Sequence, residues 1–238
     1  MANKILVIGA TSSLGVAICR VLASANHSLI LCGRNNEELE ILRQDLVIRY
    51  GIDVSITILD LAEGSLNISG IIDEEFDSIY MVAGDMGKEN KNDMDNIESI
   101  ININFTAPAK ILTAISTKME AKKQGCIVIV SSVAGDRGRQ SNYPYGAAKA
   151  GLTVFASGLR NRLCKSGVHV MTVKPGFIDT PMTFSMNSPL IARREYVAKK
   201  IMLAAESKKD SIYVPFFWCY IMLIIRHIPE FIFKKMGL

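Results

Sequence analysis

Six short apolar runs, each followed by a helical or polar stretch, limit the possible folds of this chain more than any other feature. The runs are Lys4–Ile8, Ser28–Cys32, Val54–Leu59, Ser78–Val82, Cys126–Val130 and Val168–Val173. Nearly continuous apolar runs of this length are typical of strands buried on both faces of a parallel sheet. Their alternation with helical patterns, without a repeat or linker, predicts an α/β fold with helices on both faces of one sheet.

The residues that follow these strands predict where a ligand binds. Right-handed crossovers place the C-terminal ends of parallel strands on one edge, and ligands of doubly wound, Rossmann-type sheets bind there. The residues at that edge are Gly9, Arg34, Asp60, Ala83-Gly84, Ser132 and Pro175-Gly176. With a further strand ending at Pro215, we expect about seven strands in a domain over residues 1–215 and an apolar helical extension over 216–238.

Composition and cysteine usage indicate a globular protein of a reducing compartment. Hydrophobic residues make up 49% of the 238-residue chain, which is enough for a full core. The first apolar run is only of strand length, so no secretory signal is expected. The five cysteines show neither a CxxC spacing nor a Cys/His cluster, and we expect reduced core thiols, no disulfide and no metal site. They are Cys19, Cys32, Cys126, Cys164 and Cys219.

A tyrosine and a lysine four residues apart are the strongest candidate for catalytic chemistry. Tyr145 and Lys149 fall in a predicted helix over 142–163, so they project from one face with Cβ atoms roughly 5–6 Å apart. An ammonium beside a phenol is expected to lower the phenol's pKa, which would allow proton transfer to or from a reacting oxygen. Tyr143 has Ala147 four residues on and lacks such a partner. An isolated pair of this kind is usually a surface pair, so its interpretation depends on the other motifs.

The loop between the first strand and the first helix predicts a phosphate site. It reads Gly9-Ala10-Thr11-Ser12-Ser13-Leu14-Gly15. Small residues let backbone N–H groups approach a phosphate at a helix N-terminus, where the helix dipole favours negative charge. A tight turn of small residues is the alternative interpretation, and the position directly after the first strand favours a dinucleotide.

Taken together, the motifs resemble the classical short-chain dehydrogenase/reductase family over about residues 3–215. They are Gly9-x-x-x-Ser13-x-Gly15, Ala83-Gly84, Asn104, Ser132, Tyr145-x-x-x-Lys149 and Pro175-Gly176. The chain departs from the family's TGxxxGxG pattern with Ile8 and Ser13, and from its NNAG pattern with Val82-Ala83-Gly84-Asp85.

The resemblance implies a catalytic group of four residues. Tyr145 would be the proton donor to a carbonyl, or the base toward an alcohol, and Lys149 would bind the nicotinamide ribose and lower the Tyr145 pKa. Ser132 would hydrogen-bond the substrate oxygen. Ser131 is its alternative, since neighbouring strand residues point to opposite faces. Asn104 would hold a water that links Lys149 to solvent.

The resemblance also implies the cofactor contacts. Asp60-Leu61 would contact the adenine, and the loop Pro175-Gly176, Ile178 and Thr180 would lie near the carboxamide and pyrophosphate. The remaining contacts would come from the first loop, Ala83-Gly84, Tyr145 and Lys149. An ordinary turn is the alternative for Asp60. Arg34 at the end of the second strand, with no acid before Glu37, favours NADP(H) over NAD(H). The segment 184–190 would be a lid over the substrate or an ordinary exposed connection.

The C-terminal segment combines apolar and basic character. Residues 212–225 contain no charge, but a spanning helix needs about 20 such residues, so an interfacial segment or a core helix is expected. Residues 191–238 carry nine Lys/Arg and four Asp/Glu, a net charge of +5 against +4 for the whole chain. Aromatic and basic residues beside an apolar run favour peripheral contact with anionic lipid through 216–238. An oligomer interface, or packing on the sheet edge, is the alternative, and we expect a homo-oligomer.

A finer resemblance concerns the substrate. The stretch Ser132–Asn142 and the run Val214–Trp218 resemble the decaprenylphosphoryl-2-keto-pentose (arabinose-forming) reductase subfamily. That resemblance implies a keto-sugar joined to a polyprenyl phosphate, polysaccharide synthesis, and a cytoplasmic protein at the inner face of the cytoplasmic membrane. Arg137 and Arg139 would then contact phosphate or sugar oxygens, or else be solvated charges.

Two other functions remain open at this stage. One is a reductase or dehydrogenase of a soluble ketone or alcohol, and the other is a nucleotide-binding sensor without turnover. Nucleic acid is not an expected partner, because no basic helix carries interleaved aromatic residues.

Overall fold

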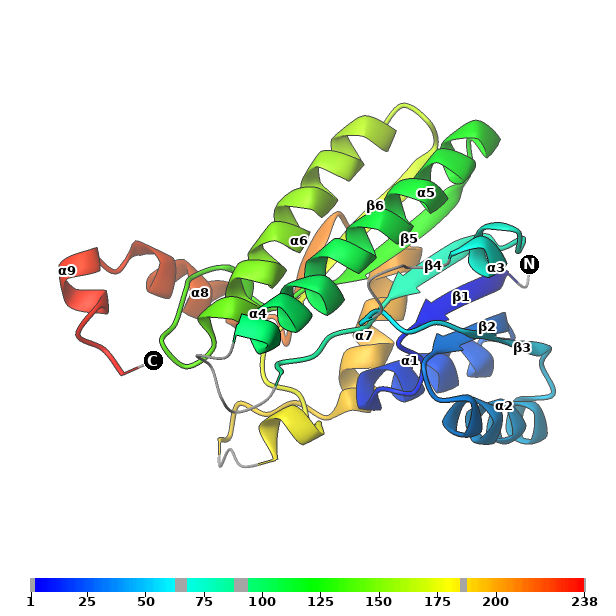
Figure 1. The fold of residues 1–238 in the computed structure, drawn as a ribbon, viewed down its shortest axis with the longest axis horizontal. Coiled ribbons are helices and arrows are strands. Elements are labelled where there is room, and N and C mark those ends of the chain that lie inside the picture. The colour runs from blue at the N-terminus through cyan, green and yellow to red at the C-terminus, as the bar shows by residue number, and fades with distance from the viewer. Residues whose placement is uncertain (1–2, 63–67, 88–93, 185–187, 238) are drawn as a thin grey trace.

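The fold is a seven-stranded parallel sheet between two helical layers (Figure 1). The computed structural model describes residues 3–62, 68–87, 94–184 and 188–237. The sheet has the order β3-β2-β1-β4-β5-β6-β7, and all its pairings are parallel, which confirms the predicted doubly wound fold. The strands are β1 Lys4–Ile8, β2 Ser28–Gly33, β3 Val54–Ile58, β4 Ser78–Met81, β5 Gly125–Val130, β6 Val168–Pro175 and β7 Ser211–Val214.

The helices cover both faces of the sheet. Figure 1 shows α5 and α6 side by side on one face and α1, α2 and α7 on the other. The helices are α1 Ser13–Ser24, α2 Asn36–Tyr50, α3 Ser69–Ile72, α4 Met94–Ile101, α5 Ala107–Lys122, α6 Tyr143–Leu163, α7 Arg194–Glu206, α8 Trp218–His227 and α9 Glu230–Phe233.

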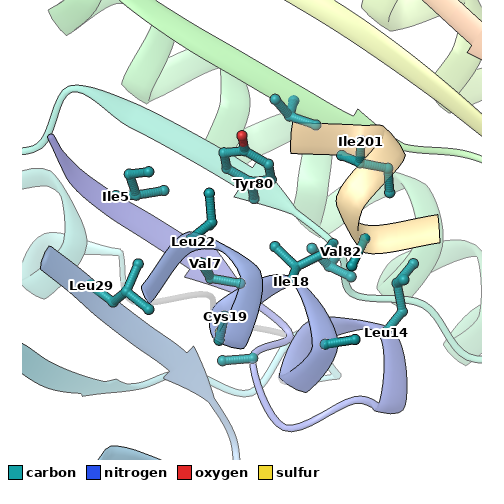
Figure 2. Packing of buried hydrophobic residues seen from close by; sticks show 14 of the residues in the cluster. Ile5, Val7, Leu14, Ile18, Cys19, Leu22, Leu29, Tyr80, Val82 and Ile201 are labelled. Carbon is teal, nitrogen blue, oxygen red and sulfur yellow. The ribbon is translucent and has the colours of Figure 1, made fainter. Parts of the chain in front are cut away.

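The strand alternation divides the core into two layers. Ile5 and Val7 pack toward α1, whereas Leu6 and Ile8 pack toward α5 and α6. Figure 2 shows the first layer, in which Leu22 of α1 and Ile201 of α7 meet the sheet. Fully burying one such aliphatic side chain contributes about 1.5–3 kcal/mol, so these contacts fix α1 and its N-terminal loop against the sheet.

The structure differs from the sequence-based expectations in three places. The sequence before Cys126 predicts one long helix up to about Lys122, but the structure interrupts this helix with a π-helical turn over Asn102–Thr106. Helix α7 was not predicted, although its buried residues Val197, Ala198, Ile201 and Ala205 have helical spacing. Cys164 is exposed rather than part of the core, because it follows the last residue of α6. Across the described ranges, no group of three or more His, Cys, Asp or Glu could hold a metal ion.

Helices α8 and α9 lie beyond the end of the sheet, next to the first turns of α6 (Figure 1). The inner face of α8 is apolar and buried: Trp218 and Met222 pack on Val133, the residue after Ser132. Its outer face exposes Tyr220, Leu223 and Ile224. Within the part of the chain that is described, none of the helices is both long and apolar enough to cross a bilayer.

Candidate active site

Tyr145 and Lys149 meet the ends of the central strands, as the sequence predicted. The Lys149 side chain is only 2% exposed, and its Nζ atom donates to the Val130 carbonyl at 3.2 Å and the Ala83 carbonyl at 3.4 Å. Nζ also lies 5.7 Å from the centroid of the Tyr145 ring. Because Val130 ends β5 and Ala83 follows β4, the pair lies at the edge of the sheet where ligands bind.

The protonation states of this pair differ from the expectation. Burial lowers the pKa of Lys149 to about 8 and raises the pKa of Tyr145 to about 12. A hydrogen bond from Ser132 acts to lower the Tyr145 pKa, and the charge of Asp85 acts to raise it. The expected lowering of the Tyr145 pKa is therefore wrong for this structure, because desolvation of the phenol outweighs the effects that lower its pKa. The phenol is protonated at neutral pH and can donate a proton.

The two adjacent serines point in opposite directions. The Ser131 hydroxyl is buried and donates to the Lys149 carbonyl at 2.9 Å, and it lies 2.7 Å from Thr153 Oγ1. Ser132 instead hydrogen-bonds Tyr145, and its Oγ accepts from the Ala134 backbone N–H at 3.1 Å. Ser132 is thus the hydroxyl that accompanies the phenol.

Asn104 lies fully buried in the π-helical turn. Its Nδ2 atom donates to the Asp85 carbonyl at 2.6 Å and the Ile100 carbonyl at 2.8 Å, and its Oδ1 accepts from the Asp85 N–H at 3.1 Å. A Cβ placed on Gly84 would lie 3.1 Å from both Asn104 Oδ1 and Lys149 Nζ. Gly84 therefore lets the amide and the ammonium approach the same point. The water-holding role of Asn104 stays a prediction.

The first loop is a compact backbone turn that fits a dinucleotide phosphate. Gly9 has φ +84°, and a Cβ there would lie 2.7 Å from the Ala83 backbone nitrogen. Ser12 caps α1: its Oγ accepts from the Gly15 N–H at 3.1 Å and donates to the Gly9 carbonyl at 2.8 Å. Ser13 opens the helix, so the free N–H groups of the first turn lie beside this glycine-lined loop. Leu14, by contrast, is buried in the core.

The loop after β2 lies beside the first loop, and the loop after β3 follows on the other side of β2. Thr11 Oγ1 would be 3.6 Å from a Cβ placed on Gly33, so the ends of β1 and β2 are adjacent. Arg34 is exposed and bonds no other described residue. Asp60 caps a local turn, because its Oδ1 accepts from the Ala62 N–H at 2.9 Å. This is the ordinary turn that the sequence allows as the alternative to an adenine contact. Leu61 is buried, and its carbonyl accepts from Asn102 Nδ2 at 2.8 Å.

The loop after β6 packs against Trp218 of α8 and pairs with the backbone of Ala192. Pro175 ends the strand, and the indole of Trp218 packs so closely that a Cβ on Gly176 would lie 1.9 Å from Trp218 Nε1. Ile178 forms a bridge with Ala192. Thr180 directly precedes a short 3₁₀ turn.

The predicted lid lies partly outside the described residues. Residues 185–187 of the segment 184–190 are not described, while Phe184 is 93% exposed.

A buried ion pair beside the site was not predicted from the sequence. Lys174 Nζ lies 2.6 Å from Asp136 Oδ1, and the Tyr213 hydroxyl donates to Asp136 Oδ2 at 2.6 Å. These contacts tie the loop that carries Ser132 to β6 and β7. The only sequence signal was a lysine inside an apolar strand, next to Pro175.

Arg137 binds the C-terminal helices. Its Nη1 atom donates to the Arg226 and Ile228 carbonyls, each at 2.9 Å, and its Nη2 pairs with Glu230 at 2.7 Å. The guanidinium also stacks 4.1 Å from the centroid of the Phe233 ring. These contacts occupy the guanidinium, so the expected phosphate contact of Arg137 is not supported.

Comparison with known proteins was consistent with this geometry. Residues 3–190 match the family model described as short chain dehydrogenase. An uncharacterized oxidoreductase of Mycobacterium tuberculosis is 30% identical over 244 residues, which cover 99% of this chain and 97% of that protein. A 3-oxoacyl-[acyl-carrier-protein] reductase of Chlamydia trachomatis is 26% identical over 199 residues, with 80% of each chain covered.

Two solved structures share the fold. A short-chain dehydrogenase from Sphingobium yanoikuyae in complex with NADPH superposes with a TM-score of 0.83 at 21% identity, covering 95% of this chain and 96% of that one. A 7beta-hydroxysteroid dehydrogenase superposes with a TM-score of 0.85 at 21% identity, covering 99% and 97%.

Proposed function

The chain belongs to the short-chain dehydrogenase family, and from that premise we propose that it is an NADPH-dependent ketone reductase with Tyr145 as the proton donor. As a member of this family it is an NAD(P)-dependent oxidoreductase. The observation that carries the proposal is the grouping of Tyr145, Lys149 and Ser132 at the C-terminal edge of the sheet, with Asn104 behind them.

Each residue has a distinct part in the proposed reaction. The nicotinamide cofactor supplies the hydride when bound. The Ser132 and Tyr145 hydroxyls hold the carbonyl oxygen and stabilise the negative charge that develops on it. Tyr145 then donates its proton to that oxygen, and the ammonium of Lys149 favours the phenolate that remains.

The raised Tyr145 pKa fits the role of a proton donor in the free protein. With a pKa of about 12, the phenol is protonated at neutral pH and is ready to act as an acid. Oxidation of an alcohol would need the phenolate, which burial disfavours. The free protein thus holds Tyr145 in the protonated form from which carbonyl reduction starts.

The preference for NADP(H) rests on the end of β2. Arg34 is exposed and has no bonded acid among the described residues, so its guanidinium is free for a 2′-phosphate. Thr11 lies beside Gly33 at the same place. The similar fold that binds NADPH in the Sphingobium protein agrees with this preference, and NAD(H) is the alternative.

The proposed substrate is a keto-sugar linked to a polyprenyl phosphate, used in making a cell-surface polysaccharide. The motif Ser132–Asn142 and the run Val214–Trp218 support it, since the first carries the catalytic hydroxyl and the second opens the C-terminal extension. In this scheme residues 1–215 form the catalytic domain, and residues 216–238 bring it to its lipid-linked substrate.

We also propose peripheral membrane contact at the cytoplasmic face, and the same extension supports it. Exposed apolar residues on α8 and α9, and one just before α8, lie beside four basic residues. The apolar residues are Phe216, Tyr220, Leu223, Ile224, Phe231 and Ile232, and the basic ones are Arg226, His227, Lys234 and Lys235. An apolar face flanked by cations suits the interface of an anionic bilayer.

The test is NADPH consumption with and without the phenol. Wild-type protein should oxidise NADPH with a keto-sugar polyprenyl phosphate, and Tyr145→Phe should lose about 10²–10⁴-fold in kcat while still binding NADPH. Retained turnover in the variant would refute Tyr145 as the acid. No turnover of any ketone by the wild type would refute the reductase.

A second candidate is a reductase of a soluble ketone, in which the extension is an interface between copies of the chain. The similarity to a 3-oxoacyl-[acyl-carrier-protein] reductase favours it. It predicts a higher kcat/KM for a soluble ketone than for the lipid-linked sugar, and a homo-oligomer that dissociates when residues 216–238 are removed.

A further inference from the structure

Helix α8 contacts two loops of the candidate active site through one side chain, Trp218. Its indole is 2% exposed and packs with Val133, the residue after Ser132. The pyrrole edge of the indole lies against Gly176 in the loop after β6, and the indole meets the Phe177 ring edge to face, with centroids 5.1 Å apart. Trp218 therefore touches both the loop that carries the Ser132 hydroxyl and the loop proposed to contact the nicotinamide end of the cofactor.

The contact between Gly176 and Trp218 leaves no space for a side chain on the glycine. A Cβ on Gly176 would lie 1.9 Å from Trp218 Nε1 and 2.1 Å from Trp218 Cε2. Gly176 has no positive φ, so its backbone conformation alone does not require glycine. The missing side chain makes room for the indole instead. Because an indole is rigid and cannot bend away from an added methyl group, the two residues fit together only as a pair.

Further contacts fix α8 to the segment that follows Ser132. Met222, on the inner face of the helix, accepts a hydrogen bond from Arg139 Nη2 at its sulfur, at 3.5 Å. In the last turn of α8, the Arg226 carbonyl accepts from Arg137 Nη1 at 2.9 Å. The helix is therefore attached to this segment along its length, which holds the indole in place between the two loops.

The indole acts here through its shape and not through a hydrogen bond. Trp218 Nε1 is buried and has no acceptor among the described residues. A buried N–H without an acceptor is unfavourable, so an apolar ring would suit this position better if only an apolar filling were needed. The indole differs from a smaller ring in its extent, which lets one side chain reach from Val133 to Gly176.

We propose that Trp218 is a positioning residue for hydride transfer: it sets the distance between the carbonyl site at Ser132 and the nicotinamide site at the loop after β6. This inference rests on the proposed reductase function. It gives the inner face of α8 a part in the reaction, in addition to the membrane contact proposed for the outer face. Reacting atoms must approach to about 3–3.5 Å, so a shift of about 1 Å in either loop is enough to lower the rate about 10²-fold.

The kinetic test uses the full chain and a water-soluble ketone that the wild type reduces, so that membrane contact plays no part. Trp218→Ala should lower kcat about 10- to 100-fold but change the dissociation constant of NADPH less than about 3-fold, because other loops hold the adenine end of the cofactor. Trp218→Phe should recover part of kcat, since its ring refills part of the space. An unchanged kcat in Trp218→Ala, or equal losses in the two variants, would overturn the positioning role.

Phe76→Ala is the matched control for lost stability. Phe76 is a partly buried aromatic residue that packs against the core layer under α5 and α6, just before β4 and at the opposite edge of the sheet from the site. This variant should lower the Tm and leave the kcat of the folded protein unchanged. Equal losses of kcat in Phe76→Ala and Trp218→Ala would show that lost stability lowers kcat, and the positioning role would be overturned.

A double-mutant cycle tests whether Gly176 and Trp218 act through their mutual contact. Gly176→Ala should lower kcat, because its methyl group displaces the indole. When Gly176→Ala is combined with Trp218→Ala the clash is absent, so the double variant should be no slower than Trp218→Ala alone. Losses that multiply would show that the two residues act independently, and the positioning role would be overturned.

Tryptophan fluorescence gives a result that does not depend on turnover or on the folding of a variant. Trp218 is the only tryptophan of the chain, so the indole emission of the wild type reports on this one position. Binding of NADP⁺, followed separately by calorimetry, should shift the emission maximum. Bound NADP⁺ without a shift would place the nicotinamide away from the indole and overturn the positioning role. A shift in a wild type that reduces no ketone would refute the reductase, while the link between Trp218 and the cofactor would stand.

Discussion

Lys174 and Asp136 form a nearly buried ion pair directly behind the loop that carries Ser132. Their side chains are 12% and 4% exposed, and Nζ lies 2.6 Å from Oδ1. Lys174 belongs to β6, whereas Asp136 follows the short turn that begins after Ser132. Because Tyr213 of β7 donates to the other carboxylate oxygen, one side chain holds three segments together at the ligand edge.

Removing the charge of Asp136 should therefore affect both stability and catalysis. Asp136→Asn leaves the Lys174 ammonium buried without a counter-charge, which typically costs about 3–5 kcal/mol of unfolding free energy. We expect a lower Tm and a lower kcat, because the Ser132 loop loses its attachment. Urea unfolding and NADPH oxidation measure the two effects.

Glu230→Gln is a suitable control for this prediction. It removes an ion pair with Arg137 whose carboxylate is 76% exposed, and such pairs contribute at most about 1 kcal/mol. If Asp136→Asn were no more destabilising than Glu230→Gln, the ion pair behind Ser132 would have no structural importance.

The buried ammonium of Lys149 should make the stability of the free protein depend on pH. Its pKa falls from 10.5 to about 8 on folding, so the unfolded chain binds more protons between these values. The linkage relation then requires stability to rise with pH through that window, with the full penalty present below pH 8.

The variant Lys149→Met isolates this effect. It should abolish turnover and yet unfold at a higher urea concentration than the wild type at pH 7, because it removes an uncompensated buried charge. The difference in unfolding free energy should shrink by about 2 kcal/mol between pH 7 and pH 9.5. A difference that stays constant over this range would show that Lys149 is not desolvated in the native state.

Sequence patterns predicted the elements that burial alone determines. The strand runs were located within one or two residues, because a strand buried on both faces must be apolar throughout. The candidate catalytic residues were also placed on the right elements, since helix α6 fixes the spacing of Tyr145 and Lys149. Because the predicted strands are parallel, the sequence also predicted that these residues lie at the C-terminal edge of the sheet.

The remaining features depend on contacts between residues far apart in the chain. The π-helical turn at Asn104 is accompanied by three hydrogen bonds of its amide, two of them to Asp85. Arg137 and Lys174 find their partners on α9 and on the loop after β5, and no local periodicity indicates such pairs. The Tyr145 pKa was predicted in the wrong direction. The sequence spacing shows that a lysine lies near the phenol, but it does not show how far burial removes the phenol from water.

The outer face of α8 provides a test of membrane contact. Leu223 and Ile224 are 57% and 68% exposed, so changing both to Glu should leave Tm almost unchanged. Each added negative charge should weaken binding to anionic vesicles by about 1 kcal/mol, in addition to the lost apolar contact. Flotation with vesicles containing phosphatidylglycerol measures this change.

Val154→Glu is the matched control, because Val154 is 72% exposed on α6, away from the extension. It should bind vesicles like the wild type. Equal flotation of the α8 variant and this control would argue against the membrane, and a change of oligomeric state in the α8 variant alone would identify the face as a subunit interface.

Arg34 offers a direct test of cofactor preference. Its guanidinium is exposed after β2 and bonds no other described residue, while the adjacent Asn35 caps α2. Arg34→Ala should raise the dissociation constant for NADPH about 10-fold or more, since a charged hydrogen bond to the 2′-phosphate is lost, and should change that for NADH much less. Fluorescence titration of both cofactors measures the two constants.

Arg43→Ala, which removes an arginine of α2 paired with Glu40, controls for the change in charge. An equal loss for both cofactors would show that Arg34 stacks on the adenine and does not select the phosphate.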